Sequence, residues 1–440
     1  MATLGGVGGV GGVGGVGGVG GVGGVGGVGG VGGVGGVGGV GSADMLGGAE
    51  SQTMGLIGHR DGICGPWQPG QPFGINPEED EFRTDANGNP VRNLDDNGQL
   101  WRWDDWVRAS VFDFELVSNL AFTLSPKDAE EEAGGTGVTL WDRGFRIDPN
   151  DTAPKFDPPK LIVQMHRPGK DVFVKQLTFM DRYSDLRAER ANETLLQMGP
   201  QAAFWSSILF LSPQRTPKTL ELLATAVRFA IAVEMRFKHA LACSRAIDYS
   251  PQVQPMIPTP GHGSLPSGHS TQAYIVAGVM NDFFRDLRNA PMATGAQPST
   301  ALHTQLYAQA RRVALNRTIA GVHFPVDTAA GHLLGTTLAE YFVHRCKIDG
   351  DRGTFTPRTF RGDQFDGEED FNDQEPLLWP ANATAAQQTD PPTMVSPDYP
   401  HIWLGKPKPT GAGSPILAWL WNEAKNEWNG KGLSGNRVPT

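Results

Sequence analysis

The chain has 440 residues, of which 39% are hydrophobic, so it is long enough to bury a core in one large domain or two ordinary ones. Its 37 Lys and Arg residues against 47 Asp and Glu residues give a formal net charge of −10, the wrong sign for a nucleic-acid-binding protein. The three cysteines are widely spaced and show neither a disulfide framework nor zinc-ligand spacing.

The first segment is a simple repeat. From Gly5 to Val40 the tripeptide Gly-Gly-Val occurs twelve times, with too few side chains to order a core. We therefore expect residues 1–50 to be a low-complexity, disordered tail. The opening MATLGG lacks the basic and leucine-rich parts of a secretory signal, and no apolar run reaches the ~18 residues needed to span a bilayer. These features predict a cytoplasmic protein without a membrane span.

Residues 51–175 are expected to form an N-terminal region that packs on a helical domain. Turn-forming residues are dense over 85–100, and residues 101–122 then bring apolar side chains at helical spacing. After Cys346 the sequence becomes rich in Gly, Pro and Asp, with a single late helical pattern over 414–428. Residues 351–440 are therefore expected to be a loop-rich C-terminal extension.

The middle segment, residues 176–350, is helical in pattern. Apolar residues recur at i, i+3, i+4 and i+7, and strand-like alternation is scarce. The helical patterns cover residues 216–245, 269–288, 300–321 and 325–346. The sequence therefore predicts an all-α protein, with a helical bundle as its catalytic domain.

Two cations stand near the end of the first of these helical patterns, in the stretch KHALACSR. Lys238 and Arg245 are seven residues apart, so about 100° per residue places them nearly on top of one another on one continuous helix face. Two positive charges on one helix face favour the binding of an anion there. The alternative is an ordinary solvated basic face.

The stretch GHGSLPSGH, residues 261–269, precedes the second helical pattern. Pro266 ends the loop, so Ser267 lies where a helix N-cap belongs, and the amides that follow lack helical partners. A helix N-terminus with a serine hydroxyl and Gly268 attracts an oxyanion, and His269 can move a proton there near neutral pH. The alternative is a capping turn without further function.

The stretch NRTIAGVHFPVD contains Arg317, His323 and Asp327. Pro325 sets a helix start, which leaves His323 just outside the helix and Asp327 in its first turn. Asp327 can accept a hydrogen bond from one ring nitrogen of His323 and leave the other as a nucleophile or metal ligand. The alternative is a buried His-Asp pair that serves structure alone.

Together, the three stretches supply the groups of an oxyanion site: three cations, a serine hydroxyl with free amides, and histidines for proton transfer. At an effective dielectric constant of about 20, each cation within ~4 Å of a unit negative charge contributes roughly 4 kcal/mol of attraction before desolvation. The sequence therefore predicts a site for a multiply charged oxyanion.

The ordered patterns Lys-x6-Arg, Pro-Ser-Gly-His and Arg-x5-His-x3-Asp resemble the superfamily of vanadium-dependent haloperoxidases and type 2 phosphatidic acid phosphatases. The resemblance covers residues 236–342. It implies that the oxygens of vanadate or phosphate are held by Lys238, Arg245, Ser267, Gly268 and Arg317. It also implies that His323 is the phosphoryl-accepting nucleophile or the vanadium ligand, that His269 is the acid-base group, and that Asp327 orients His323. Ala246 and Asn316 depart from the proline and serine usual at those positions.

His262 bears on the choice between a haloperoxidase and a phosphatase. It lies seven residues before His269, and bromide-oxidising haloperoxidases resemble this chain in having a histidine at that offset. The resemblance therefore implies a bromoperoxidase-like enzyme with vanadate as cofactor and hydrogen peroxide, halide and a small organic molecule as substrates. His262 as an idle loop residue is the alternative.

Two other functions remain open. One is a soluble acid phosphatase with a phosphohistidine intermediate, and the other is a non-enzymatic scaffold assembled through the Gly-Gly-Val tail. The spacing also leaves open whether Asp181 or Asp185 is the acidic partner of His269, and whether the protein is a homo-oligomer.

Overall fold

The structure is a computed structural model that describes residues 100–124, 137–146, 155–199, 201–287, 301–348, 353–380, 383–409 and 413–428. The expected tail, residues 1–50, lies outside the described residues, as does the expected N-terminal region up to residue 99. The chain divides into two compact units, residues 1–112 and residues 113–440. The 3-10 helix η1 (Leu100–Arg102) and most of α5 (Asp105–Val117) fall in the first unit, and every element described below belongs to the second.

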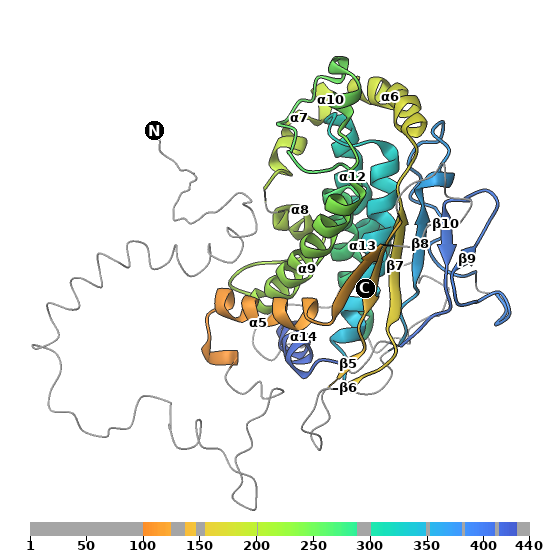
Figure 1. Ribbon diagram of the computed structural model, residues 1–440. Coiled ribbons are helices and arrows are strands. Elements are labelled where there is room, and N and C mark those ends of the chain that lie inside the picture. Colours follow the sequence, from red (N-terminus) through yellow and green to blue (C-terminus); the bar gives the residue numbers. More distant parts are fainter. Residues whose placement is uncertain are drawn as a thin grey trace, which may run out of the picture. The chain divides into compact units, whose positions relative to one another are not determined.

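Long helices form the core of the second unit, as the periodicity predicts (Figure 1). They are α9 (Pro217–Leu241), α11 (Gly268–Leu287), α12 (Ala301–Ile319) and α13 (Pro325–Arg345). Helix α11 is central, because it contacts α9, α12 and α13. A β-carbon on Gly331 or Gly335 of α13 would lie 2.6 and 2.5 Å from backbone oxygens of Ser267 and Thr271, so these glycines allow α11 and α13 to approach backbone to backbone.

Shorter helices surround this core. They are α6 (Lys170–Ser184), α7 (Arg187–Leu196), α8 (Ala202–Ser206), α10 (Ala246–Tyr249) and α14 (Pro415–Trp428), with 3-10 turns η3 (Pro251–Val253) and η4 (Gly362–Gln364). Helix α14 confirms the late helical pattern and packs on α9. Its Glu427 accepts hydrogen bonds from the backbone N–H groups of Lys218 and Thr219 at 2.6 and 2.9 Å. This carboxylate therefore satisfies the free amides at the start of α9.

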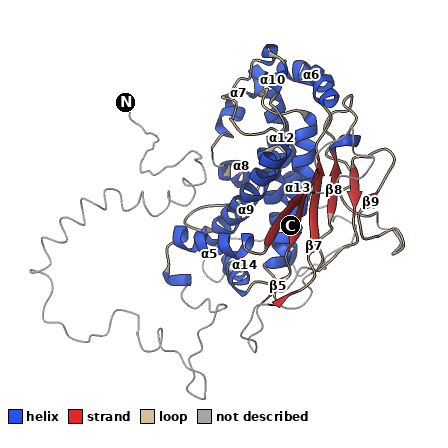
Figure 2. Ribbon diagram, in the orientation of Figure 1, coloured by secondary structure: helices blue, strands red, loops and turns tan. Residues whose placement is uncertain are grey.

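The protein is mostly helical, but it also contains a mixed sheet, so the all-α prediction is confirmed only in part (Figure 2). In spatial order the six strands of this sheet are β3 (Leu120–Leu124), β4 (Gly137–Asp142), β7 (Lys160–His166), β8 (Arg358–Arg361), β10 (Ile402–Leu404) and β9 (Thr393–Met394). The pairs are antiparallel except β7 and β8, which run parallel with Val163 opposite Arg358. A separate two-stranded ribbon joins β5 (Phe145–Arg146) and β6 (Lys155–Phe156).

The sequence pattern did not predict the sheet, because its central strands lack the usual alternation. Ile162 and Val163 of β7 are both fully buried although they point to opposite faces, so the central strands do not alternate between polar and apolar residues. The β7–β8 pair also joins the segments expected before and after the catalytic helices. Strands β7 and β8 contact α13, and β4 contacts α9, so the sheet packs against the helical core.

In the parts of the chain that the structure describes, no helix combines the length and the apolar character needed to cross a bilayer.

Candidate active site

The end of α9 and the starts of α11 and α13 carry most of the predicted site residues. Helix α9 ends at Leu241, because Ala242 takes the left-handed conformation with φ 48° and ψ 43°. Arg245 lies beyond that break, as the N-cap residue of α10. Lys238 and Arg245 therefore do not share one continuous helix face, and that part of the prediction is wrong.

The loop of residues 262–266 brings these two cations together instead. Lys238 Nζ donates to the carbonyl oxygens of Gly263 and Ser264 at 3.2 and 3.0 Å and also to that of Pro266. Arg245 Nε donates to the carbonyl oxygen of His262 at 3.0 Å. Both cations are buried and both hold the same loop.

Lys238 uses all its donors on that loop. An ammonium group has three N–H bonds, and each has a carbonyl partner here, so direct binding of an oxyanion requires Lys238 to exchange one of them. Burial lowers the pKa of Lys238 to about 8, Glu234 opposes this shift, and Arg245 adds to it. The predicted oxyanion-binding role of Lys238 stays a prediction.

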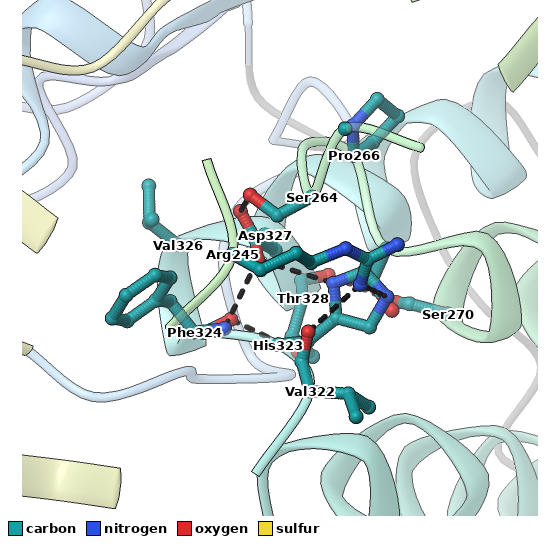
Figure 3. A network of polar contacts seen from close by, with 12 residues as sticks. Arg245, Ser264, Pro266, Ser270, Val322, His323, Phe324, Val326, Asp327 and Thr328 are labelled. Atoms are coloured by element: carbon teal, nitrogen blue, oxygen red, sulfur yellow. Dashed lines mark hydrogen bonds and ion pairs between the residues drawn. The ribbon is translucent and has the colours of Figure 1, made fainter. Parts of the chain in front are cut away.

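His323 and Asp327 form a buried pair at the start of α13 (Figure 3). Asp327 Oδ2 lies 3.1 Å from His323 Nδ1 and accepts from the Phe324 backbone N–H at 3.0 Å. Ser264 Oγ donates to the other carboxylate oxygen at 3.3 Å. The contact suggested by the spacing is therefore present, and it places the proton of a neutral His323 on Nδ1.

Burial sets the charge state of this pair. It holds the pKa of His323 well below the usual value, with Arg245 and Lys238 adding to the effect. It raises the pKa of Asp327 to about 6, opposed by the hydrogen bond from the Phe324 N–H and by the charge of Lys238. At neutral pH His323 is therefore an uncharged imidazole with a lone pair on Nε2.

The guanidinium of Arg245 lies within hydrogen-bonding distance of the lone pair on His323 Nε2. Its Nη1 lies 3.2 Å from His323 Nε2 and donates to the Val322 carbonyl oxygen at 2.8 Å, as Figure 3 shows. Its Nη2 lies 3.0 Å from His262 Nδ1. The guanidinium of Arg245 therefore joins the predicted nucleophile or ligand, His323, to the loop histidine.

Ser267 and Arg317 have buried polar atoms that find no hydrogen-bond partner among the described residues. Ser267 is the residue before α11. Its carbonyl accepts from the Thr271 N–H at 3.0 Å, its N–H donates to the Asp327 carbonyl at 2.8 Å, and its Oγ has no partner in the described part of the chain. Arg317 is 1% exposed, and no described residue accepts from its Nε or Nη1. Because buried donors without acceptors cost free energy, these atoms mark a place for a ligand rich in acceptor oxygens.

Arg317 nevertheless has a defined position. Its Nη2 donates to the Thr194 carbonyl oxygen and to Gln197 Oε1, both at 3.0 Å. Burial lowers the pKa of Arg317 to about 10, so the guanidinium is charged at neutral pH. A fixed cation whose desolvation occurred on folding is well suited to bind an anion.

His269 has a different partner from the one expected. Its Nε2 lies 2.8 Å from the Gln197 carbonyl oxygen, whereas Asp181 and Asp185 are exposed at the end of α6. The predicted acidic partner is therefore replaced by a backbone carbonyl, which the end of α7 places beside the ring. Burial lowers the pKa of His269 to about 3, and Arg317 is the next cause.

His262 lies at the exposed edge of this group of residues. Its Nδ1 is 3.0 Å from Arg245 Nη2 and 3.1 Å from the Gly263 carbonyl oxygen. One ring nitrogen cannot accept from the guanidinium and donate to the carbonyl at the same time, so the tautomer selects one of the two bonds. Partial burial lowers the pKa of His262, and Lys238 adds to this.

Two polar residues of the site were missed by sequence reasoning. The first is Glu234, on α9, which lies against Gly268. A β-carbon added at Gly268 would be 2.7 Å from Oε1 of Glu234. Gln272 donates to that oxygen at 2.9 Å, and Glu234 Oε2 is buried without a partner in the residues that the structure describes. Burial raises the pKa of Glu234 to about 7. Its position four residues before Lys238 was a usable signal. Gln197, the second one, carries no such signal in the sequence.

Comparisons with known proteins agree with the superfamily. Residues 213–347 match the family model described as the PAP2 superfamily, and this range contains every residue predicted to form the oxyanion site. No curated protein matches the sequence at a significant level. The match supports the superfamily to which the motifs pointed, and it does not support the haloperoxidase branch over the phosphatases.

One similar solved structure is described as the first transmembrane PAP2 type phosphatidylglycerolphosphate phosphatase from Bacillus subtilis. It is 18% identical in sequence, the alignment covers 39% of this chain and 84% of that one, and the TM-score is 0.30.

Proposed function

We propose that this protein is a phosphatase that hydrolyses phosphate esters through a phosphohistidine at His323. The observation that carries the proposal is a set of buried donors without partners among the described residues, in the same helical core as a neutral His323. These donors are Arg317 Nε and Nη1 and Ser267 Oγ. Burial is the main cause of the lowered pKa of His269 and of His323. The charge of Arg317 adds to the first shift, and Arg245, Lys238 and His269 add to the second.

The chemistry follows from the hydrogen bonds. Arg317 and Ser267 donate to the phosphoryl oxygens, and Arg245 moves its Nη1 donor from His323 to another of them. His323 Nε2 then attacks phosphorus while the bond to the leaving oxygen breaks, and His269 gives that oxygen a proton. Asp327 accepts the Nδ1–H of His323 and stabilises the positive charge that develops on its ring.

Water completes the cycle. It attacks phosphorus, the phosphorus–nitrogen bond to His323 breaks, and His269 takes the proton of the water. The pKa of His269 is about 3 in the free protein, because burial and Arg317 disfavour its charged form. A dianionic phosphate ester opposes the charge of Arg317 and so raises that pKa toward the range in which His269 can act as an acid.

Hydrolysis of p-nitrophenyl phosphate by the purified full-length chain in vanadium-free buffer tests the proposal. We expect turnover, strong inhibition by orthovanadate, and an acid-labile phosphoenzyme that is lost in His323→Ala. The matched control is His239→Ala, which removes an exposed histidine next to Lys238 on α9 and should keep full activity. Full activity in His323→Ala contradicts the proposal.

The second candidate function is a vanadium-dependent haloperoxidase, favoured by the contact of His262 with Arg245 at 3.0 Å. Vanadate is a tetrahedral oxyanion like phosphate, so the same orphaned donors fit it, and His323 Nε2 would be its nitrogen ligand. Bound vanadate would activate hydrogen peroxide toward halide. His262 would then adjust the proton supply or the halide environment from the edge of the site.

A paired assay separates the two functions. Bromide-dependent halogenation with hydrogen peroxide is measured beside ester hydrolysis, each with and without orthovanadate. Halogenation that needs vanadate and falls in His262→Ala supports the haloperoxidase. Hydrolysis that needs no vanadate and is unchanged in His262→Ala supports the phosphatase.

A further inference from the structure

We propose that Gln197 is the positioning residue of the oxyanion site: its side chain fixes the guanidinium of Arg317, and its backbone carbonyl fixes the ring of His269. Gln197 is the C-cap residue of α7 and is fully buried. The inference rests on the proposed function in one respect, namely that Arg317 binds an oxyanion.

The hydrogen bonds of Gln197 determine its orientation. Its Oε1 accepts from Arg317 Nη2 at 3.0 Å and from Asn316 Nδ2 at 2.9 Å, and its Nε2 donates to Glu193 Oε1 at 3.1 Å. Turning the amide by half a rotation would place its NH₂ group against two donors and its oxygen against a carboxylate. A single amide orientation is therefore compatible with these neighbours.

This arrangement orients Arg317. The two N–H bonds of Nη2 are used by Gln197 Oε1 and the Thr194 carbonyl oxygen, which fixes the plane of the guanidinium. The Nε and Nη1 donors remain without partners in the described structure. Gln197 thus holds one side of the guanidinium and leaves the rest for an anion.

The neutral charge of Gln197 matters as much as its geometry. A carboxylate at this position would pair with Arg317 and cancel the charge on which anion binding depends. The nearby carboxylate, Glu193, is itself paired with Arg312, whose Nη2 lies 2.7 Å from its Oε2. No ion pair of Arg317 with a carboxylate is present among the described residues, so its charge stays available for a ligand.

The backbone of Gln197 acts on His269. A carbonyl oxygen can only accept, so the contact of 2.8 Å places a proton on His269 Nε2 and leaves Nδ1 as the nitrogen that exchanges a proton. One residue therefore sets both the position of the cation and the tautomer of the proton-transfer group. A substitution that removes the side-chain acceptor, such as Gln197→Leu, removes the first effect and keeps the second.

The test compares Gln197→Glu with Gln197→Leu by calorimetric titration of the full-length chain with inorganic sulfate, a tetrahedral dianion that does not titrate near neutral pH. Gln197→Glu keeps an acceptor for Arg317 and Asn316 but adds a negative charge and places an oxygen against the carboxylate of Glu193. We therefore expect sulfate affinity to fall by at least about tenfold, together with a lower Tm. Gln197→Leu should lose both affinity and Tm. Gln164→Leu, on β7, is the control for loss of a glutamine hydrogen bond, here the one from Thr359.

A double-mutant cycle shows whether Gln197 acts through Arg317. In an Arg317→Met background, Gln197→Leu should not weaken sulfate binding further. With a phosphate ester as substrate, Gln197→Glu should raise KM more than it lowers kcat.

The outcomes separate the two proposals. If the wild type and Gln197→Glu bind sulfate equally well, the need for a neutral residue at this position is overturned. If a folded Gln197→Leu binds sulfate as well as the wild type, the positioning role is overturned, and in both cases the oxyanion site stands. If the wild type binds neither sulfate nor phosphate, both are overturned. A Gln197→Leu chain that does not fold leaves the test to Gln197→Glu, which retains the hydrogen-bond acceptor.

Discussion

Replacing Arg317 with methionine should separate stability from function. Arg317 is 1% exposed and carries a charge, and its Nε and Nη1 have no hydrogen-bond partners in the described part of the chain. Methionine fills a similar volume and removes the buried charge together with the unsatisfied donors. The cost is the loss of the bonds from Nη2 to Thr194 and Gln197. Gln197 Oε1 keeps its bond from Asn316 in the variant.

For the stability of Arg317→Met, the loss of the Nη2 hydrogen bonds is offset by the removal of the buried charge and its unsatisfied donors. Hydrogen bonds to charged groups contribute about 1.5–3 kcal/mol each, whereas each buried unsatisfied donor costs about 1–3 kcal/mol, before the desolvation of the charge is counted. Replacement of buried charges by well-packed apolar residues is often neutral or stabilising. We therefore expect the Tm of Arg317→Met to be at least equal to that of the wild type.

Anion binding should change in the opposite direction. Loss of one partner of a buried, hydrogen-bonded charge pair costs about 2–5 kcal/mol, and about 1.4 kcal/mol corresponds to a tenfold change in Kd. The affinity for inorganic phosphate should therefore fall by about 30- to 3,000-fold. Because burial removed Arg317 from water on folding, a bound anion gains this attraction without a further desolvation cost for the guanidinium.

Calorimetric titration with phosphate and thermal unfolding of the same samples measure both quantities. Arg311→Met is the matched control, because it removes a charge from the same helix, α12, at an exposed position paired with Asp373. It should leave the Kd for phosphate within about twofold, as screening reduces the effect of surface charges. A folded Arg317→Met protein with wild-type affinity for phosphate would refute the assignment of Arg317 to the oxyanion site.

Three further changes have defined outcomes. Asp327→Asn should lower ester hydrolysis by roughly 10- to 100-fold, because the amide no longer fixes the proton of His323 on Nδ1; an unchanged rate in steady-state assays would refute this orientation role. Folding raises the pKa of Glu234 from 4.5 to about 7, so the folded state binds that proton more tightly. The resulting stability is fully present below about pH 4.5 and is lost as the pH rises through about 7; denaturant titrations should show a smaller loss in Glu234→Gln, and equal losses would contradict this. Deletion of residues 1–41 should leave the rate of an enzyme unchanged, whereas a scaffold should lose its assembly in sedimentation experiments.

Local sequence determined the helices and the order of the site stretches. Apolar spacing predicted α9, α11, α12 and α13, and these helices begin close to the predicted residues because proline and capping positions act through neighbouring backbone atoms. Pro325 placed His323 outside α13 and Asp327 in its first turn, so the His323–Asp327 contact could be foreseen. These features depend on residues within one or two turns of one another.

Tertiary structure decided which polar groups are free to bind a ligand. The sequence suggests the same anion-binding role for Lys238 and Arg317. In the structure, three loop carbonyls accept from the ammonium group of Lys238, whereas two nitrogens of Arg317 have no partner among the described residues. His269 contacts the backbone carbonyl of Gln197, the C-cap residue of α7, which lies 72 residues earlier in the chain. A contact over that separation cannot be predicted from residue spacing. The β7–β8 pairing likewise joins segments from either side of the helical core. Hydrogen bonds between distant segments depend on which surfaces pack together, and packing is a property of the whole fold.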